Sequence, residues 1–565
     1  MPPLHPAVRR ASATGLALAA CLTTASCLTT AAGAPAGLGS AAPAGQAAGT
    51  PAAQGSQAPA GPGSGSPLDR YYQQRPHWGS CAKGPQDTAG RTMDGTGLQC
   101  ADLTVPLDYA DPRGRTITVA VSRLKATDTR HRIGTILLNI GGPGGPALQV
   151  PPVIRKAMKD VGPRYDIVGF DPRFVGRSTP LDCGWPVGTA WFSAGADRAG
   201  FDSQVALQKN LAAKCRAAGT SVLPRTPVRP HTSVLPHIST RNTARDMDIV
   251  RGALGERKIS YLGYSYGTYL GTVYTQMFPG RYDRVVLDGA FAPGDYGPRM
   301  LKGSERENEK ALADWAAWAA NRHDTYGLGR TRAAVLATVD RIVAASARKP
   351  LQVGTGADTF RLDDTQVPAL LFTATADDTD PARASFGEQM SVLARAADGA
   401  APTALSPEFA ASLRYLLQGG TEPSGVQQAI ICGDVAAPRD PRSYWRDIER
   451  SRAAHPLFGP MTRNIGPCAF WDRPREEPTR VQRDAPALIV AATGDPRTTY
   501  RSSVALHDLL PSSALLTLKG ANRHGLYGRY GSTCVDDEVN RYLATGKLPT
   551  KDRTCVKEPR TDRKG

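Results

Sequence analysis

The pentapeptide Gly263-Tyr264-Ser265-Tyr266-Gly267 places a serine hydroxyl between two glycines. A short apolar run, 259–262, precedes it, and a stretch compatible with a helix, 268–278, follows it. So tight a turn between a strand and a helix strains the serine backbone and leaves no space for neighbouring side chains, which explains the glycines. This arrangement is typical of a nucleophile elbow, in which the helix dipole favours a developing anion. We therefore predict that Ser265 is the nucleophile of an acyl-transfer reaction.

A serine nucleophile needs a base, and in sheets that carry such an elbow the acid and then the histidine follow the serine along the chain. Four of the nine histidines follow Ser265, namely His323, His455, His507 and His524. The first two fall in a helical interval, and the third lies in an amphipathic helix pattern. The last follows an apolar run, 514–518, in a loop bounded by glycines. We predict that His524 is the base, and the alternative is a structural loop histidine.

The acid is expected on the loop after the preceding strand, where Asp495 follows the apolar run 487–492. A carboxylate there can accept a hydrogen bond from the imidazole, fix its tautomer and stabilise the imidazolium during turnover. The alternative is an aspartate that only shapes the turn before Pro496. Asp484 precedes the same run and would lie at the wrong end of the sheet. We predict that Asp495 is the acid.

The oxyanion of the tetrahedral intermediate needs hydrogen-bond donors, and a glycine-rich turn follows the apolar run 134–140. Its sequence, Gly141-Gly142-Pro143-Gly144-Gly145, lets the backbone approach a substrate closely. We expect the donors to be the backbone amides of Gly142 and of Tyr266, the residue after the serine. A phosphate-binding loop is the competing interpretation, but the lysine and the serine or threonine that it needs are absent.

The elements that must position these residues are short apolar runs separated by helical patterns, which indicate an α/β fold with a mostly parallel sheet. The runs are 134–140, 165–170, 259–262, 284–287, 487–491 and 514–518. Residues 117–125 alternate in polarity and predict a strand at the sheet edge. Residues 295–480 have a helical period and lack such runs, so we expect a helical cap inserted between the two parts of the sheet domain, 68–294 and 481–565.

The N-terminus predicts export. Residues 1–34 carry Arg9 and Arg10 before an apolar run too short to cross a bilayer, which is typical of a signal peptide. The run ends at Cys21 in a sequence that resembles a bacterial lipoprotein cleavage box, so we expect a lipid anchor at Cys21. Ordinary cleavage farther along the chain is the alternative. Residues 35–67 are rich in Ala, Gly, Pro, Ser and Gln, carry no charge and predict a flexible linker.

Cysteine usage agrees with export. The chain has 10 cysteines, and eight remain when Cys21 and Cys27 of the leader are set aside. An even number in an exported chain predicts disulfides, although sequence alone permits many connectivities. We expect neighbours to pair, as Cys81–Cys100, Cys183–Cys215, Cys432–Cys468 and Cys534–Cys555. A zinc site is the weaker alternative, because no two of these cysteines have the close spacing of metal knuckles.

Charge and hydropathy exclude several classes. The 68 basic and 51 acidic residues give a net charge of +17, but the charge is scattered, without a long basic run or a nucleic-acid motif. We therefore expect no nucleic-acid partner. No run of about 20 apolar residues follows the leader, so an internal membrane span is not expected. The sequence offers no metal or organic cofactor site.

Taken together, the motifs carry a family resemblance. The chain resembles the secreted bacterial tripeptidyl aminopeptidases, relatives of prolyl aminopeptidase within the α/β-hydrolases, over residues 78–555. Besides the Ser265, Asp495 and His524 segments, the shared motifs are the glycine-rich turn, Phe170-Asp171-Pro172-Arg173, Leu287-Asp288-Gly289, Ile431-Cys432-Gly433-Asp434, Cys468-Ala469-Phe470-Trp471 and the terminal pair Cys534 and Cys555.

The resemblance implies an exopeptidase that removes short peptides, with tripeptides as the expected product, from substrates with a free N-terminus. Such an enzyme must recognise an α-ammonium group, and a buried carboxylate in the cap is the natural partner. The candidates are Asp434 and the acids of residues 305–309, and the alternative for each is a solvated surface charge. Two other functions stay open: a carboxylesterase that uses the same triad, and a surface-displayed binding lipoprotein that has lost activity.

Overall fold

The structure, a computed structural model, describes residues 66–223, 233–418 and 424–558. The predicted leader, the expected lipid-anchor site at Cys21 and nearly all of the expected linker lie outside these residues. No helix in the described part of the chain has the length and apolarity needed to cross a membrane.

A nine-stranded sheet forms the centre of the described residues, with the strand order β1-β2-β4-β3-β5-β6-β9-β10-β11. The two pairings of β2 are antiparallel and all the others are parallel. The strands are β1 (Gln99–Pro106), β2 (Thr116–Leu124), β3 (Gly134–Asn139), β4 (Tyr165–Phe170), β5 (Ile259–Tyr264), β6 (Tyr282–Asp288), β9 (Leu488–Ala492), β10 (Ala514–Lys519) and β11 (Arg553–Val556). The predicted α/β-hydrolase fold with a mostly parallel sheet is therefore confirmed.

One strand expectation is wrong. The run 117–125 was expected at the sheet edge, but β2 lies between β1 and β4, and β1 is the edge strand on that side of the sheet. The middle of β2, residues 119–122, is buried, and its more exposed residues lie toward its ends. The alternating polarity of this run therefore does not indicate a strand at the sheet edge.

Helices cover both faces of the sheet and form two separate apolar cores. On one face, α6, α7 and α17 pack against side chains such as Leu137 and Ile489. On the other face, α4 and α18 pack against the side chains that alternate with these, such as Leu138 and Val490. Because both faces are covered, the central strands read as continuous apolar runs. The helices of the sheet region are α2 (Asp69–Tyr72), α3 (Thr88–Asp94), α4 (Pro151–Ala157), α6 (Thr240–Ala253), α7 (Tyr266–Met277), α17 (Tyr500–Leu509) and α18 (Thr533–Thr545).

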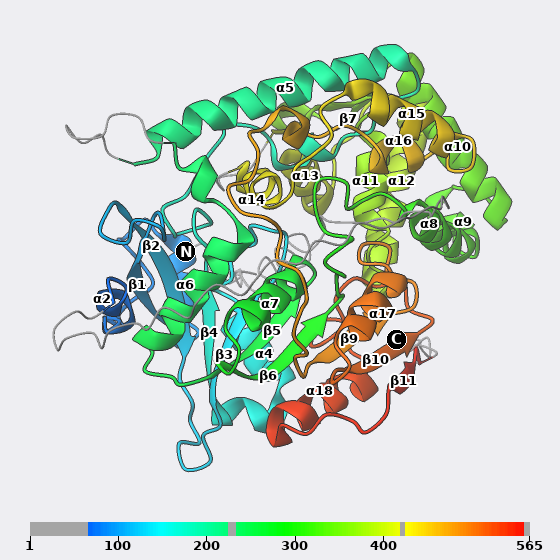
Figure 1. Cartoon of the computed structure of the whole chain (residues 1–565). Coiled ribbons are helices and arrows are strands. Elements are labelled where there is room, and N and C mark those ends of the chain that lie inside the picture. The colour runs from blue at the N-terminus through cyan, green and yellow to red at the C-terminus, as the bar shows by residue number, and fades with distance from the viewer. Residues whose placement is uncertain (1–65, 224–232, 419–423, 559–565) are drawn as a thin grey trace, which may run out of the picture.

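A helical insertion, here called the cap, separates β6 from β9, as the fold prediction requires. In the view of Figure 1 it lies above the sheet. Its elements are α8 (Glu305–Ala320), α9 (His323–Tyr326), α10 (Arg332–Arg348), β7 (Leu351–Val353), β8 (Phe360–Leu362), α11 (Val367–Ala374), α12 (Asp380–Ala397), α13 (Pro407–Leu413), α14 (Val426–Asp434), α15 (Pro441–Arg452) and α16 (Gly459–Thr462).

The helical layer also receives a segment that precedes the nucleophile. Helix α5 (Arg198–Ser221) runs along the top of the cap in Figure 1. Its Phe201 belongs to one apolar cluster with Tyr444 and Ile448 of α15. Just before α5, Trp191 Nε1 donates a hydrogen bond to Gln427 Oε1 at 2.8 Å. This segment falls within residues 68–294, which were expected to belong to the sheet domain. A helical period predicts a helix but not the layer in which the helix packs.

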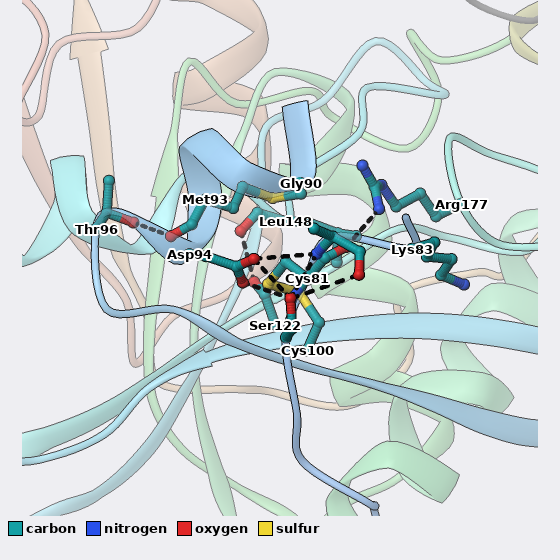
Figure 2. The surroundings of a disulfide bond; sticks show 12 residues. Cys81, Lys83, Gly90, Met93, Asp94, Thr96, Cys100, Ser122, Leu148 and Arg177 are labelled. Carbon is teal, nitrogen blue, oxygen red and sulfur yellow. Dashed lines mark hydrogen bonds between the residues drawn. A yellow bond between two sulfur atoms is a disulfide. The ribbon is translucent and has the colours of Figure 1, made fainter. Parts of the chain in front are cut away.

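All four predicted disulfides are present in the described residues. Cys183–Cys215 joins α5 to the segment before it and packs against Gly425 at the start of α14. Figure 2 shows Cys81–Cys100 beside Asp94, whose Oδ1 accepts the backbone amide of Cys81 at 2.6 Å.

Candidate active site

Ser265 occupies a strained turn between β5 and α7. Its φ is 55° and its ψ is −124°, a conformation that a residue with a Cβ adopts only under constraint. A Cβ on Gly263 would lie 2.4 Å from the carbonyl oxygen of Gly267, so the first glycine of the motif is required. The backbone amide of Ser265 donates to the carbonyl of Asp288 at 2.9 Å, and the whole residue is 4% exposed. The predicted elbow is thus formed.

His524 and Asp495 contact each other as the sequence predicted. His524 Nδ1 lies 2.9 Å from Asp495 Oδ2, and the two residues are 5% and 2% exposed. The backbone amides of Arg497 and Thr498 donate to Asp495 Oδ1 at 2.7 and 3.1 Å, and Thr498 Oγ1 donates to Oδ2 at 2.8 Å. Donors on both oxygens hold the carboxylate in one orientation.

The other histidines downstream of Ser265 bond elsewhere. His323 accepts the amide of Gly329, His455 contacts Glu309, and His507 contacts Ser513. The first two lie in the cap and the third lies on α17. The arrangement therefore leaves His524 as the histidine beside the acid.

Gly289, which follows β6, marks the point where the loops meet. A Cβ built on it would lie 2.9 Å from Thr498 Oγ1, 3.3 Å from His524 Cε1 and 3.4 Å from Asp495 Oδ2. The serine turn is bonded to the residue before this glycine. Strands β5, β6, β9 and β10 are parallel neighbours, so their carboxyl ends bring the three predicted residues to one edge of the sheet.

The glycine-rich turn lies against the elbow. A Cβ built on Gly141 would come 2.9 Å from Ser265 Cβ and 3.3 Å from the amide nitrogen of Tyr266. Gly141 and Gly142 have φ values of 91° and 110°, which other residues rarely adopt. The two segments expected to supply the oxyanion donors, the amides of Gly142 and Tyr266, are therefore adjacent.

Asp434, at the end of α14, is 6% exposed and is not a solvated surface charge. Its Oδ1 accepts the backbone amide of Thr240 at 2.6 Å, and its Oδ2 accepts the hydroxyls of Thr240 and Tyr296 at 2.5 and 2.9 Å. The Thr240 hydroxyl in turn lies 2.7 Å from the Tyr266 hydroxyl. Burial raises the pKa of Asp434 to about 7. The carboxylate is thus linked to the side chain of the residue after the nucleophile.

The acids at the start of α8 have different surroundings. Glu305 is buried and its Oε1 accepts from Arg463 Nε at 2.6 Å. Glu309 contacts His455, and burial raises the pKa of its carboxyl. Glu307 is half-buried, and its Oε2 has no hydrogen-bond partner among the described residues.

Asp288, which ends β6, belongs to a motif quoted for the family resemblance, but the sequence predicted no role for it. Its Oδ2 accepts the backbone amides of Leu526 and Tyr527 at 2.8 and 2.7 Å, so it anchors the chain just after His524. Burial, aided by the negative charge of Asp495, raises the pKa of Asp288 to about 7. An aspartate directly after an apolar run, at the same sheet edge as the triad, was the signal that could have found it.

The described residues contain no cluster of three or more His, Cys, Asp or Glu side chains suited to a metal ion. The chemistry that this arrangement can perform is acyl transfer, because it places a serine, an imidazole and a carboxylate near the two segments expected to supply the oxyanion donors.

Comparisons with known proteins agree with this geometry. Residues 455–555 match the family model described as TAP-like protein. The tripeptidyl aminopeptidase of Streptomyces lividans is 33% identical over 478 residues, which cover 81% of this chain and 84% of that protein. Serine protease Hip1 of Mycobacterium tuberculosis is 29% identical over 81% of this chain and 87% of its own length. Carboxylesterase B of the same organism is 30% identical over 85% of this chain and 89% of its own length. The chain therefore belongs to the tripeptidyl aminopeptidase family of α/β-hydrolases and is a serine hydrolase of the aminopeptidase type.

Proposed function

We propose that this chain is an exported serine exopeptidase that releases short peptides, tripeptides first among them, from free N-termini, with Ser265, Asp495 and His524 as its triad. The observation that carries the proposal is the 2.9 Å contact between His524 Nδ1 and Asp495 Oδ2, at the same sheet edge as the strained serine turn. The tripeptidyl aminopeptidase relatives support the expected product.

The reaction would follow two steps. Ser265 attacks the scissile carbonyl while His524 takes the serine proton, and Asp495 holds the imidazole and stabilises the imidazolium. The tetrahedral oxyanion rests on the amides of Gly142 and Tyr266. The amine product leaves with the proton from His524, and water then hydrolyses the acyl-enzyme by the same route.

Asp434 is our first candidate for recognition of the substrate α-ammonium group. It lies on the cap side of the elbow, one hydroxyl away from the Tyr266 side chain. Burial disfavours the ionised form of this carboxyl and raises its pKa. A cation beside it favours the ionised form, so the ammonium group of a substrate N-terminus would provide the positive charge that pairs with the carboxylate. Glu305, Glu307 and Glu309 of α8 are the other candidates.

Export and anchoring belong to the same proposal. The four disulfides support an oxidising compartment, and the lipoprotein-like box at Cys21 supports attachment to the outer face of the membrane. In a native host, wild-type protein should partition into the detergent phase of a phase-separation assay and Cys21→Ala protein into the aqueous phase. Wild-type protein in the aqueous phase would favour ordinary secretion instead.

The decisive assay compares tripeptide p-nitroanilides that have a free N-terminus with the same compounds N-acetylated. We expect hydrolysis of the free-amine compounds, refusal of the acetylated ones, and no hydrolysis by Ser265→Ala protein. Equal rates on both compounds would contradict the exopeptidase function while leaving serine hydrolysis intact.

A carboxylesterase is the second candidate, favoured by the carboxylesterase B relative. The same triad serves both reactions, and only the pocket distinguishes them. A kcat/KM for short-chain p-nitrophenyl esters well above that for every free-amine peptide would favour this function.

A further inference from the structure

The cap bonds directly to the two loops that carry the proposed acid and base. We call residues 493–499 the acid loop and residues 520–527 the histidine loop. We infer that two cap residues, Asn308 and Asp378, are positioning residues that hold these loops in register, so that hydrolysis depends on a seated cap.

Asn308, on α8, is completely buried and uses all of its hydrogen-bonding capacity. Its Nδ2 donates to the carbonyl of Pro496, the residue after Asp495, at 2.8 Å and to the carbonyl of Ser304 at 2.8 Å. Its Oδ1 accepts from Arg497 Nη1 at 2.8 Å and from Thr375 Oγ1 at 3.2 Å. One side chain thus joins two cap segments to the acid loop.

Arg497 strengthens this junction. Its side chain is completely buried, and its guanidinium lies 3.6 Å from the centroid of the Phe372 ring on α11. The backbone amide of the same residue donates to Asp495 Oδ1 at 2.7 Å. Because the cap holds the Arg497 side chain, it also holds the amide that orients the acid.

Asp378 performs the corresponding task at the histidine loop. It is buried in the connection between α11 and α12. Its Oδ2 accepts a hydrogen bond from the backbone amide of Asn522 at 3.0 Å and forms an ion pair with Lys557. Two positions before it, the carbonyl of Ala376 accepts the backbone amide of His524 at 3.0 Å. The backbone of the cap is therefore hydrogen-bonded directly to the backbone of the proposed base.

Two further contacts bond the histidine loop to the cap. Arg523 forms an ion pair with Asp377 of the cap, and Asn522 Nδ2 donates to Asp314 Oδ2 of α8 at 2.7 Å. Three consecutive residues, 522–524, are thus bonded to the cap, while Asp288 of the core anchors the chain beyond them. His524 lies between a cap anchor and a core anchor.

The consequence is catalytic as well as structural. Loops have low local stability unless they are tied down, and a misplacement of about 1 Å in an active site can lower the rate about 100-fold. The acid and histidine loops come from different strands, and the cap bonds to both of them. Loss of either cap contact should therefore misalign the imidazole against the carboxylate or the serine, without changing how substrate binds.

The test uses the full chain with Asn308→Ala and Asp378→Ala. We expect kcat to fall about 10- to 100-fold with KM within about threefold, and labelling of Ser265 by a fluorophosphonate to slow by a similar factor. The labelling needs only a reactive serine, so its outcome does not depend on exopeptidase specificity. Melting temperatures measured in parallel report any loss of stability.

Two cap residues give matched controls. Gln389 is a buried amide whose hydrogen bond goes to Ser385 of its own helix, and Asp447 is a buried carboxylate whose cationic partners all belong to the cap. Gln389→Ala and Asp447→Asn should lower the melting temperature but change kcat and the labelling rate less than about threefold. Equal losses in these controls would overturn the inference.

Conservative variants distinguish the hydrogen bond of Asp378 to the Asn522 amide from its ion pair with Lys557. Asp378→Asn keeps an acceptor for the Asn522 amide, and Lys557→Met removes only the ion pair, so each should stay within about threefold of wild-type kcat. If an alanine variant does not fold, Asn308→Asp serves in its place. It adds a negative charge beside the acid loop and should move the acidic limb of the kcat/KM profile to higher pH. Wild-type kcat in the alanine variants, or an unmoved profile in Asn308→Asp, would contradict the positioning role.

Discussion

The serine turn and the two loops that face it are held in different ways. Ser265 is fixed by its own chain: β5 leads into it, α7 leads out of it, and its amide bonds to the backbone of Asp288 on the next strand. The acid and histidine loops are bonded to the cap, in part through the side chains of Asn308 and Asp378, which reach residues 188 and 144 positions away. A nucleophile can thus be built locally, whereas its partners depend on tertiary contacts.

The largest effect should come from the acid itself. Asp495→Asn should lower kcat about 10⁴-fold, because an amide cannot stabilise the imidazolium and favours the wrong tautomer. Steady-state kinetics on a free-amine tripeptide anilide measure it. Asp484, at the opposite end of β9, accepts from Ser512 and gives the matched control, since Asp484→Asn should change kcat less than about threefold. A fall in kcat of only a few fold in Asp495→Asn would show that Asp495 is not the catalytic acid.

A second prediction concerns the point where the loops converge. Gly289→Ala should lower kcat about 10- to 100-fold, because the added methyl group would press on Thr498 and His524. Gly280 has a similar positive φ, of 80°, but open space around its Cα. Gly280→Ala should therefore cost only about 1 to 2 kcal/mol of stability for the backbone strain, with kcat unchanged. Equal kcat values in the two variants would show that crowding at Gly289 does not matter.

The sequence predicted the elements whose signals are local. Ser265 lies within five residues that encode the turn, Asp495 and His524 each follow a buried apolar run, and the cysteines pair with their neighbours. The central strands read as apolar runs because both sheet faces are covered.

What the sequence did not predict depends on long-range packing. A helical period places α5 in a helix but not in the layer with α15, and the polarity of β2 did not reveal that β1 covers its edge. Asn308 and Asp378 are polar residues in a helical interval, where a solvent-facing position is the ordinary expectation. Their role becomes visible only when the acid and histidine loops are placed against them.

Asp434 tests the cap side of the site. If it binds the substrate ammonium, Asp434→Asn should raise KM for free-amine tripeptide anilides about 10- to 100-fold, because one charge-assisted hydrogen bond is lost. Inhibition constants of peptides with and without a free amine provide the readout. If the variant binds both peptides as wild type does, Asp434 does not bind the amine, and the acids of α8 become the candidates.

The smallest effect concerns pH and the core anchor Asp288. Burial raises its pKa to about 7, so the folded protein holds this proton at pH values where the unfolded chain has lost it. Its contribution to stability is present below about pH 4 and is lost as the pH rises to about 7. In Asp288→Asn this loss disappears, so the free energy of unfolding of the variant should rise relative to that of wild type as the pH goes from 4 to 7. Urea unfolding at several pH values measures it, and a constant difference would contradict the assignment.

The most direct test of the central claim is the site and rate of fluorophosphonate labelling. In the wild-type protein one adduct should form and map to Ser265, Ser265→Ala should stay unlabelled, and His524→Ala should react at least 10³-fold more slowly. An adduct on another residue, or full labelling without His524, would contradict the claim that these side chains act as one catalytic unit.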